Sequence, residues 1–481
     1  MNKTAKNSIV YLSGTIIMAL LGFANTMLLT RVLSQKVYAM YGLLVSFNTT
    51  STMLVSFGYD KAYMRFYYSS GYSKRRFLLK CIQIPAIVMA ALFIICIEPS
   101  QLLINYIFGE KLIFITILLI CFYIIVAVIN KFTHLTARME ECAVNYVLSE
   151  AVEKSGFVIF ILILFYLHND VSFDHLIISF LIAGVLASLI NLRILFRIND
   201  VPAEAEQVSH KVMLHYGIPL MLNQVLLMVI PMIEKLFVRE AAGWEILSLY
   251  TSASFIQTVL MLISHTVTNI WSPLVFKLCD QDNKLKPLIH SFGLACSFII
   301  LACLFGCILL RRWIVLLLDS KYYTVYTILP AVMYSAGISI VTLIYSCGIE
   351  IRKKTKILVL IPILQGSLSI GLCLLLIPSL GLVGVAIATL VSTMISKGLR
   401  MFIGLKLYDS GRSEWKSAVL IALGGVFSIA SLFFVSLGSD LLMAFGLIIL
   451  VLLIANKEII EIMKILKSIV FSRKKAGLKG D

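Results

Sequence analysis

Charged side chains lie inside or at the ends of strongly apolar stretches of this sequence, where an unpartnered charge is costly. Lys397 and Arg400 are three residues apart, so on a helix they would share one face. Arg31 and Arg65 each follow an apolar stretch. Arginine binds phosphate oxygens through paired hydrogen bonds, so these four residues indicate an anion-binding role. The alternative for each is a helix-end anchor whose charge reaches toward water.

Acidic residues and a histidine form a second set of ionisable groups in apolar surroundings. Glu150, Glu153 and Lys154 are spaced three and four residues apart, so Glu150 can pair with Lys154 on one helix. His265 lies deep in another apolar stretch and could titrate near neutral pH. Glu150, Glu153 and His265 are therefore candidate coupling residues for a proton or cation. The alternatives are a self-neutralising set between helices and a hydrogen-bonded interior histidine.

Side-chain amides recur in the apolar stretches. Their paired donors and acceptors suit a hydroxyl-rich ligand, whereas the alternative is hydrogen bonding between helices. The amides near the beginning of the chain and in its middle are the candidates for a polar cavity wall, namely Asn25, Asn48, Asn223, Gln224 and Gln257. Further amides of this kind are Asn130, Asn269 and Gln365.

The apolar stretches that carry these residues are long enough to cross a membrane. Hydrophobic residues make up 60% of the 481-residue chain and charged residues 14%, against about 25% charged in soluble proteins. A spanning helix needs about 20 apolar residues. We predict an all-α polytopic membrane protein with about fourteen spans. They are 8–30, 39–59, 79–97, 112–130, 145–167, 173–192, 214–233, 246–272, 287–310, 323–349, 357–377, 381–404, 417–437 and 441–456.

The distribution of basic residues predicts the orientation. A net charge of +16 would indicate nucleic-acid binding in a soluble protein, but here the basic residues collect on one side. With the N-terminus inside, 33 of the 41 Lys and Arg residues fall on the inner side and 8 on the outer side. Both termini are therefore predicted to be cytoplasmic, with no nucleic-acid partner. After Asn456 we expect a basic amphipathic helix at the inner surface, or else a solvated tail.

A weak internal repeat predicts how the spans are grouped. The segment beginning at Tyr41 is similar to that beginning at Tyr250, and Gly184-Val185 to Gly384-Val385, each about 200 residues apart. Parallel repeats of this kind are typical of transporters. We predict a six-helix lobe over 1–205, a second over 206–410, and two further helices with the basic tail over 411–481.

Three segments together resemble a known family. They are NSIVYLSGTIIMALLGFANTMLLTRVLS with YAMYGLLVSF, then GYDKAYMRFYY with Gly58 and Arg65, and GLVGVAIATLVSTMISKGLR from Gly381 to Arg400. They are similar to the polysaccharide-flippase branch of the multidrug/oligosaccharidyl-lipid/polysaccharide exporter superfamily. The resemblance covers the first twelve spans. It implies two six-helix lobes around a central cavity that opens alternately to each side, in a bacterial cytoplasmic membrane.

The resemblance implies an undecaprenyl-diphosphate-linked oligosaccharide as cargo, flipped from the inner to the outer face for surface polysaccharide synthesis. Membrane lipids are expected partners, and a polysaccharide polymerase and glycosyltransferases are candidate partners. A lipid II flippase and a multidrug-type antiporter remain alternatives; the latter usually has acidic residues deep in a lobe.

An enzyme, either a polytopic glycosyltransferase or a polymerase, is the alternative from another class. Such enzymes normally carry carboxylates on a long outer loop, and the predicted outer loops are short. The sequence has no P-loop, catalytic triad or zinc-ligand spacing. Cys303 and Cys307 are one helical turn apart, without a histidine or carboxylate beside them. We therefore predict no catalytic residue, no metal and no cofactor.

Overall fold

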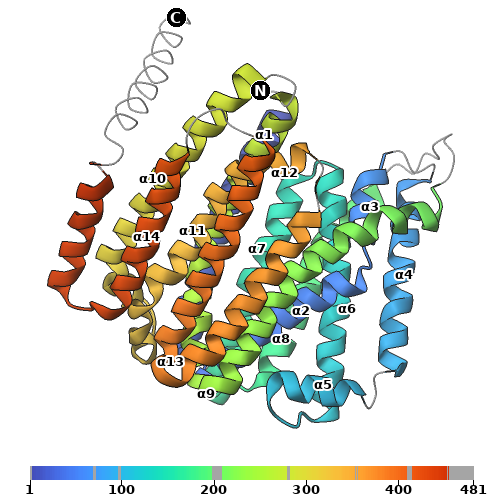
Figure 1. Ribbon diagram of the computed structural model, residues 1–481. Coiled ribbons are helices and arrows are strands. Elements are labelled where there is room, and N and C mark those ends of the chain that lie inside the picture. Colours follow the sequence, from blue (N-terminus) through green and yellow to red (C-terminus); the bar gives the residue numbers. More distant parts are fainter. Residues whose placement is uncertain are drawn as a thin grey trace, which may run out of the picture. The chain divides into compact units, whose positions relative to one another are not determined.

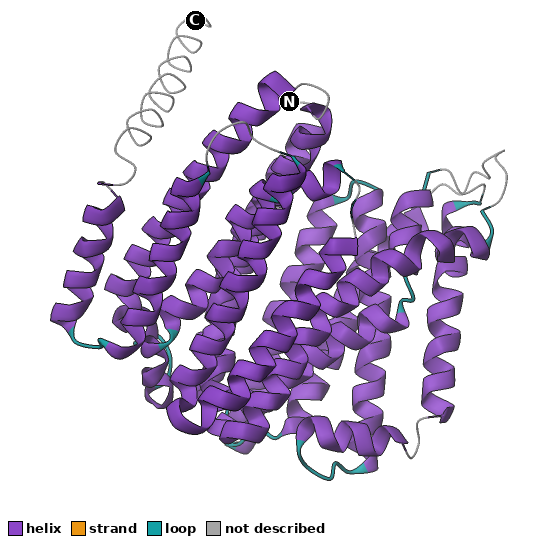
Figure 2. Cartoon of the chain, viewed as in Figure 1, coloured by secondary structure: helices purple, strands orange, loops and turns teal. Residues whose placement is uncertain are grey.

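The computed structural model describes residues 3–68, 72–95, 99–197, 208–278, 282–352, 354, 356–408, 414–451 and 453. Figures 1 and 2 show that these residues form helices joined by short connections, with no strand among them. The elements up to residue 197 are α1 (Lys3–Val32), α2 (Gln35–Val55), α3 (Tyr59–Phe66), α4 (Lys74–Ile95), α5 (Pro99–Phe108), α6 (Phe114–Met139), α7 (Ala143–His168) and α8 (Phe173–Arg197). Those after it are α9 (His210–Leu278), α10 (Asp282–Val315), the 3-10 helix η1 (Ser320–Thr327), α11 (Leu329–Tyr345), α12 (Cys347–Ile351), α13 (Lys356–Leu407), α14 (Trp415–Phe433) and Leu437–Val451.

The chain divides into two compact units, unit 1 over residues 1–255 and unit 2 over 256–481. The predicted lobe boundary after residue 205 rests on an internal repeat, which is a different criterion from compactness, and it stays a prediction. Two of the helices are broken within their length. Gly243 has φ of 80° in α9, and Gly381 has φ of 53° in α13. Glycine reaches positive φ without steric cost, which explains a sharp break at each site.

The described residues of the fourteen predicted spans lie mainly on helices, and α9 and α13 each cover two spans. Seven described helices are long and apolar enough to cross a membrane, or eight if η1 and α11 form one span. The exact number of crossings therefore stays a prediction. The range 323–349 was predicted as a single span, but it begins in η1 and bends by 58° into α11. Short α3 and α5 were not predicted, and the tail helix after Asn456 lies outside the described residues.

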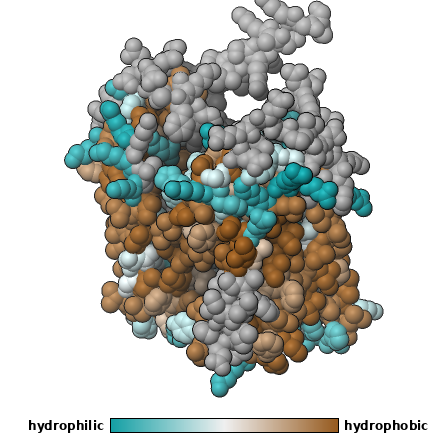
Figure 3. Space-filling model, turned by 90° about the vertical axis from the view of Figure 1, so that its right-hand side faces the viewer, coloured by the Kyte–Doolittle hydropathy of each residue, from teal (hydrophilic) through white to brown (hydrophobic). Residues whose placement is uncertain are grey.

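Many large apolar side chains are exposed on the surface of these helices. Tyr166 is 85% exposed, Leu442 77% and Leu102 76%. On the face shown in Figure 3, apolar residues form a broad surface with hydrophilic residues along its upper edge. Because large exposed apolar patches are unfavourable in water, lipid is the solvent of this surface. The described chain is thus a polytopic all-helical membrane protein.

Unit 1 is built on α6, α7 and α8, which pack against one another, with α1 lying against α7. Stacked rings fill part of this interior, and Phe157 and Phe180 lie with ring centroids 3.9 Å apart. Tyr41 of α2 stacks on Phe157 at 5.6 Å. Aromatic stacking of this kind adds specific geometry to apolar packing, so it holds α2 on the α7 and α8 core.

Unit 2 is centred on α11, which packs against α10, α13 and α14. Close approach to α11 is made possible by glycines on its neighbours. Gly293 of α10 faces Tyr345, and Gly424 of α14 faces Tyr334, leaving no space for a Cβ at either position. The Tyr334 hydroxyl donates to the Ile421 carbonyl at 2.7 Å. These contacts position α10 and α14 beside α11.

Candidate functional site

A polar cluster lies among α6, α7 and α8 of unit 1; we call Asn130, Glu150, Glu153, Lys154 and Ser188 the unit 1 polar cluster. Lys154 Nζ lies 3.5 Å from Glu150 Oε1, which forms the predicted i,i+4 pair. Glu153 lies against the side-chain amide of Asn130, which is 5% exposed. Ser188 donates a hydrogen bond to Asn130 Oδ1. The cluster holds one more carboxylate than ammonium group, so it is suited to a proton or a cation.

Two predicted amides join this cluster from neighbouring helices. Asn25 of α1 donates through Nδ2 to the Lys154 carbonyl at 3.1 Å. Asn48 of α2 interacts with the side chain of Tyr123, which also lies within electrostatic range of Glu153. Four predicted residues, Asn25, Asn48, Glu150 and Glu153, are therefore brought into one region of unit 1.

Unit 2 holds a cavity of about 420 Å³ between α11, α13 and α14, with Lys397 in its wall. Lys397 is partly buried, and none of the described carboxylates forms an ion pair with it. Arg400 lies close enough to act electrostatically on Lys397. We call this space the Lys397 cavity. The side chains that line it are mostly apolar and comprise Ile338, Thr342, Met394, Lys397, Met401, Phe402, Leu405, Glu414, Trp415, Ala418, Ile421 and Ala422, with Gly398.

Two carboxylates border the basic pair. Glu414, at the start of α14, lines the same cavity and accepts a hydrogen bond from His290 Nδ1 at 2.9 Å when that nitrogen is protonated. Glu350 of α12 interacts with Arg400. Burial raises the pKa of the Glu350 carboxyl, and the Arg400 guanidinium opposes that shift. Arg400 thus has a partial counter-charge, whereas Lys397 is the cation that faces the open space.

The remaining predicted residues lie elsewhere. Arg31 is exposed at the end of α1. Arg65 is exposed on α3, with its guanidinium 5.8 Å from the Phe66 ring centroid. Gln257 belongs to unit 2, where it donates to Ser335 Oγ at 3.2 Å. Gln224 lies partly exposed on α9. The side chains of Asn223 and His265 are outside the described residues.

Sequence reasoning missed Glu414 and Glu350 and treated Asn130 only as one amide among several. Glu414 carries a signal that could have found it, because it stands directly before the apolar run that begins at Trp415. Nothing in the local sequence connects Glu350 with Arg400, fifty positions later. Their proximity depends on how α12 packs against α13.

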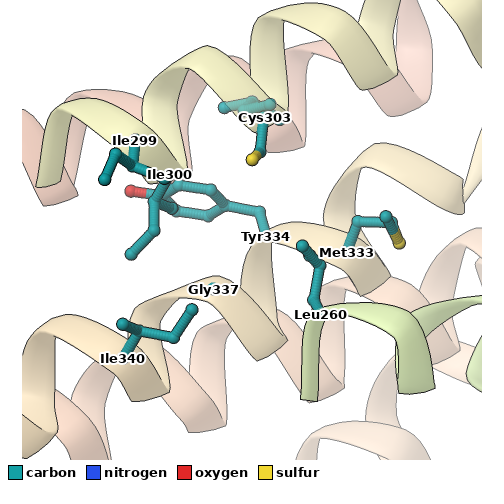
Figure 4. A pocket seen from close by; sticks show the side chains of 9 residues that line it. Leu260, Ile299, Ile300, Cys303, Met333, Tyr334, Gly337 and Ile340 are labelled. Atoms are coloured by element: carbon teal, nitrogen blue, oxygen red, sulfur yellow. The ribbon is translucent and has the colours of Figure 1, made fainter. Parts of the chain in front are cut away.

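A second pocket of unit 2 lies beside Tyr334 and is far smaller, at about 20 Å³ (Figure 4). The figure shows aliphatic side chains and the Cys303 thiol around the Tyr334 ring. This space is lined by Leu260, Ile299, Ile300, Cys303, Leu304, Met333, Tyr334, Gly337 and Ile340. With no charged group in its lining it offers no recognition chemistry. The Lys397 cavity and the unit 1 polar cluster are therefore the candidate sites.

The fold is that of a known class of membrane transport proteins. An inward-facing multidrug resistance MATE family transporter of the MOP superfamily superimposes with a TM-score of 0.66 at 15% identity, over 86% of this chain and 98% of that one. The lipid II flippase MurJ in an inward closed conformation gives 0.65 at 15% identity, over 94% and 100%. At such identities the likeness establishes the fold.

The sequence establishes the family. The model of the family described as polysaccharide biosynthesis protein matches residues 4–279, which is more than half of the chain. The chain belongs to this family, which confirms the resemblance found in the sequence. A search of curated proteins finds no match.

Proposed function

We propose that this protein is a flippase that moves an undecaprenyl-diphosphate-linked oligosaccharide from the inner to the outer face of the bacterial cytoplasmic membrane. The observation that carries the proposal is the Lys397 cavity. It combines a lysine lacking a described carboxylate partner with a largely apolar wall. A phosphate attached to a lipid chain has the same combination of an anion beside an apolar group.

The two sides of the cavity suit two parts of the cargo. Lys397 and Arg400 would neutralise the diphosphate, and a charge at this depth interacts more strongly than in water. The apolar side chains of α11 and α14 would contact the first part of the lipid chain. Glu414 on the same wall limits how tightly an anion can bind, since like charges repel. A transported anion must leave again, so moderate affinity is an advantage.

The amides and the exposed arginines have supporting roles in this proposal. Asn25, Asn48, Asn223, Gln224 and Gln257 would contact the sugars as they pass. Arg31 and Arg65 would attract the anionic cargo at the two membrane faces. Polysaccharide polymerase and glycosyltransferases, which consume and supply the cargo, are the proposed partners.

The membrane potential can drive this movement. A diphosphate carries about two negative charges, and one charge gains roughly 2.3 kcal/mol per 100 mV. Moving it outward from a negative interior therefore gains about 4–5 kcal/mol per 100 mV. A coupling ion is not required on energetic grounds. If one is used, Glu150, Glu153 and His265 are the candidate residues to carry it. Glu153 is the first of these to test, because its carboxyl lies against the side-chain amide of Asn130.

Two transport alternatives share this fold. The relatives in the structural comparison include proteins named as a lipid II flippase and as multidrug transporters. Lipid II has the same diphosphate–lipid chemistry, so the Lys397 cavity fits it as well. A cationic drug fits the cavity less well because Lys397 and Arg400 would repel it.

The test is flipping of fluorescent lipid-linked oligosaccharide in proteoliposomes by the wild type and Lys397→Ala. We expect the variant to lose at least about tenfold in rate, since a hydrogen bond to a charged group contributes about 1.5–3 kcal/mol. Lys397→Arg should keep most of the activity. Lys406→Ala is the matched control, because Lys406 lies exposed on the same helix. Lipid II and a lipophilic cation are offered in parallel assays.

The outcomes separate the alternatives. If the protein flips lipid II alone, lipid II is the cargo in place of the lipid-linked oligosaccharide. If it transports the lipophilic cation alone, it is a multidrug transporter and not a flippase. Equal rates for Lys397→Ala and Lys406→Ala would show that the cavity does not bind the cargo. A potassium–valinomycin potential, negative on the side where the cargo starts, should accelerate flipping without any sodium or proton gradient. If only an ion gradient accelerates it, and Glu153→Gln removes that effect, the movement is ion-coupled.

A further inference from the structure

Two glycines bring the backbones of two helical segments into direct contact in unit 1. Gly58, at the turn between α2 and α3, has φ of 78°. Gly217 lies in the first half of α9. A Cβ on either glycine would overlap the backbone of the other. The charge distribution assigns this end of both segments to the cytoplasmic side, and we call the contact the glycine seam.

Gly217 needs an explanation that Gly58 does not. Gly58 is required by its positive φ, a conformation that other residues rarely adopt. Gly217 lies within a continuous helix, where glycine is less favourable than alanine. Its backbone contact with Gly58 is what excludes a side chain there. Met213, Met221 and Val225 lie on the same face of α9 and are 1%, 8% and 9% exposed, so this face is covered.

The contacts that the described residues make around the glycine seam are separate from one another. The Tyr59 hydroxyl and His210 Nδ1 lie 2.8 Å apart, and Phe66 meets Tyr216 edge-to-face. Lys80 Nζ donates to the Val208 carbonyl at 2.9 Å. Among the described residues these are single polar or ring contacts, and at the centre backbone meets backbone. Such an interface can part and close again without repacking a core.

The other end of the same α9 segment is held more firmly. The buried Lys235 donates to the Gly42 carbonyl at 3.1 Å and to Ser46 Oγ at 2.9 Å. Arg239, 6% exposed, donates to the Tyr106 carbonyl at 2.6 Å. Just beyond lies the break at Gly243, where no neighbour would obstruct a side chain. The segment is therefore held by hydrogen bonds at the end that lies next to this break.

We propose that the glycine seam is a gate: the first half of α9 swings about its Lys235 and Arg239 end, so that the seam opens and closes in each transport cycle. The inference rests on the proposed function only in that it assumes a transport cycle. In the six-span repeat that the sequence predicts, α9 begins the second lobe. The seam then joins the two repeats on the cytoplasmic side, where a cargo made in the cytoplasm has to enter.

Gly217→Ala tests the gate, because alanine favours the helix and disturbs only the seam. Met213→Cys, in a cysteine-free background, reports on the covered face of α9. We expect a membrane-impermeant maleimide from the cytoplasmic side to label it about fivefold faster in the Gly217→Ala protein, and flipping to fall about tenfold, as a shift of a two-state population predicts. Gly22→Ala is the control, since Gly22 is helical with open space around it. Labelling needs no cargo, so it tests the seam even if the proposed cargo is wrong.

A cross-link provides a second measurement that does not depend on the alanine variant folding. Tyr59→Cys with His210→Cys is joined by a short bifunctional thiosulfonate and released with reductant. We expect the cross-linked protein to stop flipping and the reduced protein to recover. Undiminished flipping in the cross-linked protein, or equal labelling of the Gly217→Ala and Gly22→Ala proteins, would show that the seam is static packing.

Discussion

Arg311 and Lys397 are both cations in apolar surroundings of unit 2, yet their surroundings differ. Arg311 of α10 is fully buried and donates to Asp440, to the Ser431 carbonyl at 2.7 Å and to the Phe434 carbonyl at 2.9 Å. Lys397 of α13 faces a cavity, and no described carboxylate forms an ion pair with it. The protein itself supplies acceptors for the guanidinium of Arg311, whereas the ammonium of Lys397 faces a cavity in which a ligand can bind.

The difference separates structural cations from candidate binding cations. Arg311 binds the carbonyls at the end of α14 and the carboxylate of the following helix, so it ties both to α10. Arg239 caps the end of α5 in the same way. Both belong to the eight basic residues that the sequence places on the outer side, and both bind other parts of the protein. Lys397 forms no ion pair with a described carboxylate.

The largest effect is expected from Arg311→Ala. It removes the closer of the two arginines that pair with Asp440, which is 2% exposed, leaving Arg312 Nε at 3.7 Å, and two carbonyls lose their donor. Breaking a buried ion pair typically costs about 3–5 kcal/mol of unfolding free energy. We expect a low yield and a clearly reduced temperature of half-unfolding, measured by the loss of the monodisperse peak after heating in detergent.

Two further variants calibrate that result. Arg311→Lys keeps the charge but not the forked geometry, so an intermediate loss is expected. Lys321→Ala removes an exposed cation of η1 and should leave stability unchanged. If Arg311→Ala were as stable as Lys321→Ala, the contrast between Arg311 and Lys397 would lose its basis.

An intermediate effect is expected from Glu414→Gln, which removes the negative charge from the Lys397 cavity. The cavity becomes more positive, so the affinity for a lipid diphosphate should rise by about threefold to tenfold, in line with the interaction of partly exposed charges. Release should slow by a comparable factor. Binding of fluorescent undecaprenyl diphosphate in detergent measures the affinity. Weaker binding in Glu414→Gln would instead indicate that the carboxylate positions Lys397 or His290 for the ligand.

Much of this fold could be predicted from the sequence because membrane helices are encoded locally. Twenty apolar residues and a biased count of flanking lysines and arginines need no tertiary information. The bend between η1 and α11 could not be predicted, because Ser320–Thr327 is short and its direction depends on packing. The same holds for α5, whose ten residues are too few to cross a bilayer.

The candidate sites were predictable only in part. Lys397, Arg400 and Glu153 were found because a charge in an apolar run is visible in the sequence. Whether each charge has a partner depends on interactions between residues far apart in the chain, such as the electrostatic interaction of Arg400 with Glu350. Arg65 shows the limit most clearly, since it was predicted as a binding residue at the end of a span and lies exposed on α3.

The smallest effect is therefore expected from Arg65→Ala. Its guanidinium is exposed to water and rests over the Phe66 ring, so any attraction for an anionic cargo acts at long range and is screened by salt. We expect the rate at subsaturating cargo to fall about twofold at low ionic strength, and hardly at all near 0.5 M salt, where the screening length is only a few ångströms. Arg65→Lys should restore the rate, because steering depends on charge rather than on a forked donor. Lys321→Ala, on the opposite predicted face, is the control. A loss that persists at high salt and is not restored by lysine would mean that Arg65 holds a phosphate directly, and would move it into the same group as Lys397.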